Sequence, residues 1–157
     1  MSVIGIDPGL EGAFAIFVED GTYCVVDTPT ITFEKHGKTR RAYEVTRIAD
    51  ALRALRAEVF LELVNAQPKN ATRAAFLMGR GVGMWEGIIG TLGLPLHYVA
   101  PQSWKRHHRL LGTDKQAARL KAQQLFPAAD LRRKKDVGRA DALLIADYGR
   151  HLLRGAA

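Results

Sequence analysis

The first third of the chain alternates short apolar runs with turn residues. We predict three strands there, over residues 3–7, 12–18 and 23–27, separated by the dipeptides Pro8-Gly9 and Asp20-Gly21. Dipeptides of this kind mark tight turns between strands. A three-stranded meander therefore begins the fold. The polar, basic segment that follows, residues 28–41, has little periodicity, so we expect a mobile loop that could touch a substrate.

The rest of the chain predicts helices that alternate with short strands. Residues 43–55 carry apolar side chains at the spacing of one helical face, and the compact apolar run 58–64 predicts a buried strand. We expect a Gly-rich helix over residues 72–92, a strand over 96–99, and helices over 102–109, 114–125 and 139–153. This order predicts an α/β fold with a mixed β-sheet and helices on both faces. A length of 157 residues predicts one domain over residues 1–157.

Composition excludes several classes of protein. No apolar run reaches the roughly 18 residues of a membrane span, and the start MSVIGIDPG carries no secretory signal pattern, so we expect a cytoplasmic protein. Cys24 is the only cysteine, which excludes an internal disulfide, and its setting YCVVD predicts a buried thiol. The five histidines show no ligand spacing along the chain, so a structural zinc is not expected.

Positive charge is concentrated in one segment. The whole chain has a net charge of +7. Between Pro101 and Lys135, ten Lys and Arg residues face only Asp114 and Asp130, so this segment is +8 and the remainder is −1. Such a concentration is typical of proteins that bind polyanions, because neutralised phosphates release counterions. A solvated basic surface is the alternative.

Three carboxylates occupy positions where a charge needs a partner. Asp7 ends the apolar run VIGID, Glu62 lies inside FLELV, and Asp141 is near the start of the apolar helix RADALLIADYG. Singly, they have ordinary explanations as a turn former, an outward-facing strand residue and a helix cap. Together they suit a two-metal site for phosphodiester cleavage, in which carboxylate oxygens hold Mg²⁺ or Mn²⁺.

Longer motifs carry a family resemblance. IGIDPGLEGAFAI resembles the first-strand motif of the RuvC-type Holliday junction resolvases, which belong to the ribonuclease H-like superfamily. FLELVNAQP, GRGVGMWEGIIGTLGLPLHYVAPQSWK, DKQAARLKAQQLFP and DVGRADALLIADYG follow in the family's order. The similarity is strongest to the phage-encoded branch. It implies a ribonuclease H-like fold and a homodimeric endonuclease that nicks branched DNA, above all four-way junctions, with two Mg²⁺ or Mn²⁺ ions per site and no small-molecule cofactor.

The resemblance also implies the site residues. Asp7, Glu62 and Asp141 match the family's metal ligands and catalytic acids. The fourth ligand would fall at Gly138 or Val137, neither of which can bind a metal, so we assign Asp136 to that role. A helix N-cap is the alternative for Asp136. A basic residue is also expected after the glutamate, where this chain has a leucine.

Two further features complete these expectations. The candidate phosphate contacts are Lys105, Arg106, Arg109, Lys134 and Lys135, and Trp104 is expected in the core. Gly79, Gly83 and Gly87 line one face of the Gly-rich helix, and the resemblance implies that this helix pairs two subunits. Tight packing of that helix on the sheet is the alternative.

Alternative functions remain open at the level of sequence. The missing fourth ligand leaves room for a non-catalytic module that binds branched DNA. A nuclease with relaxed specificity for flaps or Y-structures would use the same chemistry. Actin-like ATPases also begin with a GIDxG strand and turn, but they need a second lobe for which 157 residues leave no room. If the chain is phage-encoded, its compartment is the host cytoplasm.

Overall fold

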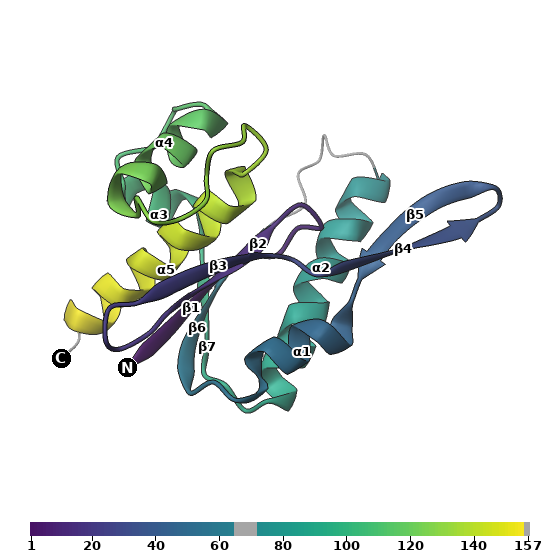
Figure 1. The fold of residues 1–157 in the computed structure, drawn as a ribbon, viewed down its shortest axis with the longest axis horizontal. Helices are drawn as coiled ribbons and strands as arrows, with labels where there is room; N and C mark the ends of the chain where they lie inside the picture. Colours follow the sequence, from purple (N-terminus) through teal and green to yellow (C-terminus); the bar gives the residue numbers. More distant parts are fainter. Residues whose placement is uncertain (65–71, 156–157) are drawn as a thin grey trace.

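The fold is organised around one mixed β-sheet. The computed structural model describes residues 1–64 and 72–155, so the end of the FLELVNAQP motif, residues 65–68, lies outside the described residues. Figure 1 shows the main sheet, with strand order β3-β2-β1-β6-β7. The antiparallel pairs β1–β2 and β2–β3 confirm the expected meander, and β1, β6 and β7 run parallel. The bounds are Ser2–Asp7 (β1), Ala13–Phe17 (β2), Tyr23–Asp27 (β3), Ala57–Glu62 (β6) and Leu96–Val99 (β7).

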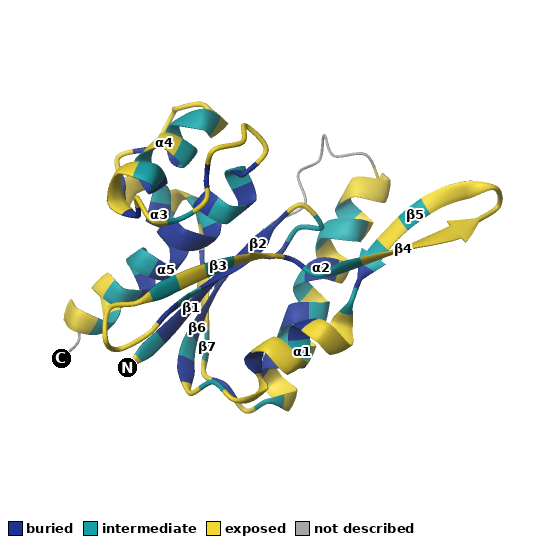
Figure 2. Ribbon diagram, in the orientation of Figure 1, coloured by how far each residue is buried: buried dark blue, intermediate teal, exposed yellow. Residues whose placement is uncertain are grey.

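Helices pack on both faces of this sheet, which confirms the expected fold class. On one face lie α1 (Val45–Arg53) and α2 (Thr72–Thr91). The other face is covered by α5 (Val137–Gly155), which carries α3 (Pro101–His107) and α4 (Lys115–Leu125) on its outer side. Successive side chains of β1 point to opposite faces of the sheet and pack into two separate hydrophobic cores. Figure 2 shows the buried central strands and inner helix faces.

A glycine in β1 brings α5 unusually close to the sheet. A Cβ atom on Gly5 would overlap the backbone of Ala142 and Ala146 in α5. The bare backbone of Gly5 and the small alanines opposite it therefore allow close approach of helix and strand. This contact holds the N-terminal half of α5 beside the end of β1, where Asp7 lies.

The expectation of a mobile loop over residues 28–41 is wrong, because this segment forms a β-hairpin. Strands β4 (Thr30–Lys35) and β5 (Lys38–Tyr43) pair antiparallel and project from the main sheet (Figure 1). His36 (φ 53°) and Gly37 (φ 67°) both have positive φ, as a two-residue type I′ turn requires. An ion pair between Arg41 and Glu11 ties the hairpin to the β1–β2 turn.

Two other expectations from the sequence have opposite outcomes. Trp104 is fully buried, as expected. Cys24 is exposed, and the prediction of a buried thiol is wrong. The reason is its place on β3, at the edge of the sheet: Tyr23 and Val25 pack on the core of the α5 side, so Cys24 faces the other way. Within the described ranges, no helix has the length and hydropathy to cross a membrane.

Candidate metal-binding active site

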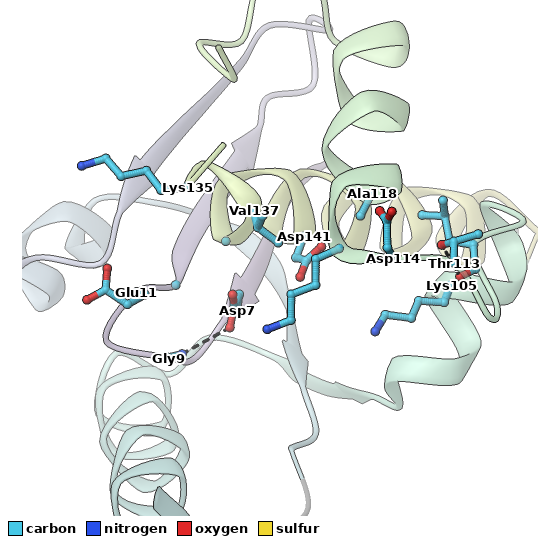
Figure 3. A pocket seen from close by; sticks show the side chains of 14 residues that line it. Asp7, Gly9, Glu11, Lys105, Thr113, Asp114, Ala118, Lys135, Val137 and Asp141 are labelled. Carbon is cyan, nitrogen blue, oxygen red and sulfur yellow. Dashed lines mark hydrogen bonds between the residues drawn. The ribbon is translucent and has the colours of Figure 1, made fainter. Parts of the chain in front are cut away.

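Three carboxylates converge at one edge of the sheet. Asp7 is the last residue of β1 and Glu62 is the last residue of the parallel neighbour β6, so the two strands end side by side. Asp141 lies in the second turn of α5, and Figure 3 shows Asp7 and Asp141 directed into the same pocket. The structure thus brings together the three acids that the sequence singled out.

The pocket at this edge combines acidic and basic side chains. Its volume is about 370 Å³, and the turn between β1 and β2 forms one wall (Figure 3). The charged residues that line it are Asp7, Glu11, Asp114, Asp141, Lys105, Lys115 and Lys135. A pocket of this kind suits a ligand with both cationic and anionic parts, such as a divalent ion together with a phosphate group.

Burial raises the pKa of all three acids, and repulsion between carboxylates adds to the shift of Asp7 and Asp141. Burial, and next the charge of Glu62, raises the pKa of Asp7 to about 6. Burial followed by the charges of Asp7 and Glu62 raises the pKa of Asp141 to about 8. Burial also raises the pKa of Glu62, although a hydrogen bond from Trp104 opposes the shift. Without a cation these groups repel one another, so the site favours the binding of positive charge.

The donor set fits divalent metal ions. Oδ1 of Asp141 is buried and has no hydrogen-bond partner among the described residues, a costly state that a bound cation relieves. Carboxylate oxygens are the preferred ligands of Mg²⁺ and Mn²⁺. Among residues 1–64 and 72–155, the group whose potential ligand atoms all lie within 4.8 Å of one another is His107, His108 and Asp147, and not these three acids.

Helix α3 orients Glu62 and supplies a cation. Nε1 of the buried Trp104 donates a hydrogen bond of 2.8 Å to Oε1 of Glu62. The ammonium group of the next residue, Lys105, lies 5.2 Å from the centre of the Trp104 ring and the residue lines the pocket. The core position expected for Trp104 thus also directs the polar edge of its ring at Glu62 in the candidate site.

Lys115 is a pocket residue that sequence reasoning did not single out. Asp114 caps α4 by accepting hydrogen bonds from the backbone of Gln116 (2.8 Å) and Ala117 (2.9 Å). This cap fixes the first turn of α4, and Lys115 in that turn lines the pocket. Both Lys115 and Lys105 act to lower the pKa of Asp7 and Asp141. In the sequence, the cap residue Asp114 indicates that Lys115 lies in the first turn of a helix. It does not indicate which way the lysine side chain points.

The structure does not bring Asp136 into this group. Its carboxylate accepts hydrogen bonds of 2.8 Å from both the backbone N and Nε of Arg133, and it lines a separate pocket with Asp27 and Arg41. Although burial by itself acts to raise the pKa of Asp136, the hydrogen bonds and charge of Arg133 hold it below its usual value. Its backbone carbonyl accepts the bond from Ala140 N that begins α5. Asp136 therefore occupies the N-cap position, with its side chain committed to Arg133.

Gly138 lies in a space too small for the fourth ligand that the resemblance implies near this position. A Cβ atom at Gly138 would overlap the carbonyl oxygen of Glu11 and lie 3.2 Å from Oδ2 of Asp7. The turn between β1 and β2 thus fills the space that a side chain at residue 138 would need.

Only one of the remaining candidate phosphate contacts lines the pocket. Lys135 is exposed and lines the pocket, with its side chain directed away from the two aspartates (Figure 3). The other three, Arg106, Arg109 and Lys134, are exposed and do not line it.

Comparison of structures identifies the fold as that of RuvC, a ribonuclease H-like fold. Thermus thermophilus RuvC in complex with a Holliday junction substrate matches with a TM-score of 0.65 at 18% identity, over 99% of this chain and 96% of that one. A second structure of RuvC from the same organism matches with a TM-score of 0.64 at 20% identity, over 99% and 97%. No protein-family model matches the chain.

One curated protein shows sequence similarity to part of the chain. The chloroplastic Holliday junction resolvase MOC1 of Chlamydomonas reinhardtii is 35% identical over 92 residues. The match covers 57% of this chain and 10% of that much longer protein. The two comparisons agree, because both lead to proteins associated with Holliday junctions.

Proposed function

We propose that this chain is a divalent-metal-dependent endonuclease that resolves Holliday junctions by paired nicks. The convergence of Asp7, Glu62 and Asp141 beside two lysines, in a RuvC fold, carries the proposal. The names of the similar proteins point to the same substrate. We also propose that the protein acts in the compartment that holds this DNA, which is the cytoplasm of a bacterium or of a phage-infected cell.

In this proposal, residues of the chain bind the metal ions, orient a ligand and contact the DNA. Asp7, Glu62 and Asp141 would hold two Mg²⁺ or Mn²⁺ ions, which supply an activated water and offset the charge on the leaving oxygen. Trp104 keeps the carboxylate of Glu62 oriented through its hydrogen bond. Lys105 and Lys115 bind the phosphate at the pocket, while Arg106, Arg109, Lys134 and Lys135 contact the flanking DNA backbone.

A junction-cleavage assay tests the proposed function. Full-length protein is incubated with a synthetic four-way junction or with a linear duplex of the same sequence, with Mg²⁺, Mn²⁺ or EDTA. We expect two symmetric nicks in the junction only when metal is present. Junction binding without nicking would instead support a non-catalytic module. Equal cleavage of flaps and Y-structures would support a nuclease of relaxed specificity.

The role of Asp136 is tested by its amide variant. Ligation by Asp136 would require its carboxylate to leave Arg133, so we propose a site of three carboxylates. We expect Asp136→Asn to retain nicking within a few-fold of wild type and to lose some stability, because Asn weakens the pairing with Arg133. Nicking rates and thermal melts measure both effects. A loss as severe as that of Asp141→Asn would restore Asp136 as the fourth ligand.

The glycine-rich face of α2 supports the proposed homodimer. Cβ atoms on Gly83 or Gly87 would meet nothing within 4 Å, so this face is not packed against the described part of its own chain. Together with Val45 of α1 and with Met84 and Ile88, the two glycines line an apolar groove of about 410 Å³. A second copy of α2 is the occupant we propose, because a two-fold dimer would present two identical sites to the two strands.

A bulky residue in this groove is expected to separate the subunits. Gly83→Leu would fill the space that the partner helix needs, and we expect monomers by light scattering and loss of coupling between the two nicks. Gln124→Leu places the same side chain on the exposed face of α4 and serves as the control. Circular dichroism verifies that both variants are folded. A folded Gly83→Leu protein that stays dimeric would place the interface elsewhere.

A further inference from the structure

A group of potential metal ligands lies where α3 ends against α5. His107 and His108 come from the end of α3, and Asp147 comes from α5. One ligand atom from each of these side chains lies within 4.8 Å of the others. The histidines have no metal-site spacing along the sequence, and this grouping arises because two elements meet in space.

The ring of His108 is buried and oriented by a hydrogen bond to the backbone. It is buried, with 5% of its surface exposed, and burial lowers its pKa, which favours the neutral imidazole. Its Nε2 lies 3.0 Å from the carbonyl oxygen of Leu144, which can only accept a hydrogen bond, so Nε2 donates and Nδ1 keeps the lone pair. Metal-bound histidines commonly donate their second ring nitrogen to a carbonyl in this way.

The other groups lie around the His108 ring and reach solvent, since His107 is exposed and Asp147 is partly exposed. Oδ2 of Asp147 lies 3.9 Å from Nε2 of His108, the nitrogen that faces the Leu144 carbonyl, so Asp147 lies beside the same ring. The exposed ring of His107 lies 4.7 Å from that of His108 and 4.5 Å from that of His151, measured between ring centres. His151 follows Asp147 by four residues on α5, so both lie on the same face of that helix. A fourth ligand is thus within reach.

We propose that His107, His108 and Asp147 form a second metal site, selective for transition metals such as Zn²⁺ or Co²⁺ and completed by His151 or water. Imidazole nitrogens with one carboxylate suit these ions, whereas Mg²⁺ prefers an all-oxygen set. The site is separate from the carboxylate pocket. Asp147 follows Asp141 by six residues, which is about 9 Å along the helix axis and roughly 120° around it.

A metal at this site would join α3 to α5. The helix α3 carries Trp104, which orients Glu62, and Lys105, which lines the pocket. The ion would bind the folded protein preferentially, because its ligands come from two elements that meet only after folding. Binding should therefore raise the melting temperature, and the effect should not depend on nuclease activity.

Cobalt titration of the full chain tests the proposal. With Mg²⁺ in excess to occupy the carboxylate pocket, we expect one equivalent of Co²⁺ to bind with visible ligand-field absorption, and Zn²⁺ to displace it. His107→Ala and Asp147→Ala should each weaken Co²⁺ binding at least ten-fold and remove the Zn²⁺-dependent gain in melting temperature. His36→Ala, which alters an exposed histidine of the hairpin, should change neither.

Variants of the carboxylate pocket separate this site from the nuclease. Asp7→Asn should bind Co²⁺ as wild type does, even though nicking is lost. Co²⁺ binding that disappears in Asp7→Asn and persists in folded His107→Ala and Asp147→Ala would overturn the proposal, as would the absence of Co²⁺ binding to wild type. Because the readout is binding, failure of the proposed junction cleavage would leave this result intact.

Discussion

Asp141→Asn is expected to abolish nicking and yet to stabilise the metal-free protein at pH 8. The folded-state pKa of Asp141 is raised to about 8 by burial and by the charges of Asp7 and Glu62, whereas an unfolded aspartate has a pKa near 3.9. The protonated form is thus favoured by folding. Its contribution to stability is fully present below about pH 4 and is lost as the pH rises through about 8. At pH 8 wild type carries a penalty that a neutral asparagine lacks.

The two effects have opposite signs and are measured on the same protein. We expect the melting temperature without metal to rise by roughly 2–8 °C, equivalent to about 1–2 kcal/mol. Nicking should fall by roughly 100-fold or more, because metal ions that stabilise the charge of the transition state lower its free energy by several kcal/mol. Added Mg²⁺ should stabilise wild type and have little effect on the variant.

Matched variants show whether these effects belong to the site. Asp50→Asn removes the same charge from the exposed surface of α1, and it should change neither nicking nor the response to Mg²⁺. Asp7→Asn should lose nicking as Asp141→Asn does while retaining junction binding. Wild-type nicking by Asp141→Asn would remove this residue from the metal site, and a lowered melting temperature would contradict its raised pKa.

Gly138→Ala is expected to damage both stability and nicking although it adds only one methyl group. The new Cβ would overlap the carbonyl oxygen of Glu11, which belongs to the turn that follows Asp7. Backbone cannot move aside as a side chain can, so overpacking should cost about 1–3 kcal/mol. Displacement of the turn should move Asp7 and lower nicking by at least ten-fold, since catalysis is sensitive to small shifts.

An open helical glycine provides the control for this variant. A Cβ atom on Gly90 of α2 meets nothing within 4 Å, and alanine is the better helix former by about 1 kcal/mol. Gly90→Ala should therefore keep full stability in thermal melts and full activity in the junction assay. If Gly138→Ala equals this control in both measurements, the turn tolerates a side chain, and the steric reason for the missing ligand is wrong.

Local patterns predicted the framework of the protein well. The meander, the two faces of helices and the core position of Trp104 follow from apolar periodicity, which each segment carries in its own residues. The hairpin over residues 30–43 was missed because a His36-Gly37 turn is not a common sequence signal, although Gly37 permits the positive φ. Cys24 was misplaced because the sequence does not tell an edge strand from a central one.

The sequence by itself also determined three acids of the candidate site, since Asp7, Glu62 and Asp141 each interrupt or border an apolar segment where an unpaired charge is costly. Only the tertiary structure decided their surroundings. It turned Asp136 toward Arg133, set Lys115 at the pocket and closed the space beside Gly138. It also joined His107 and His108 to Asp147, about 40 residues along the chain. Periodicity reports which face of an element is buried, whereas these contacts depend on how separate elements meet.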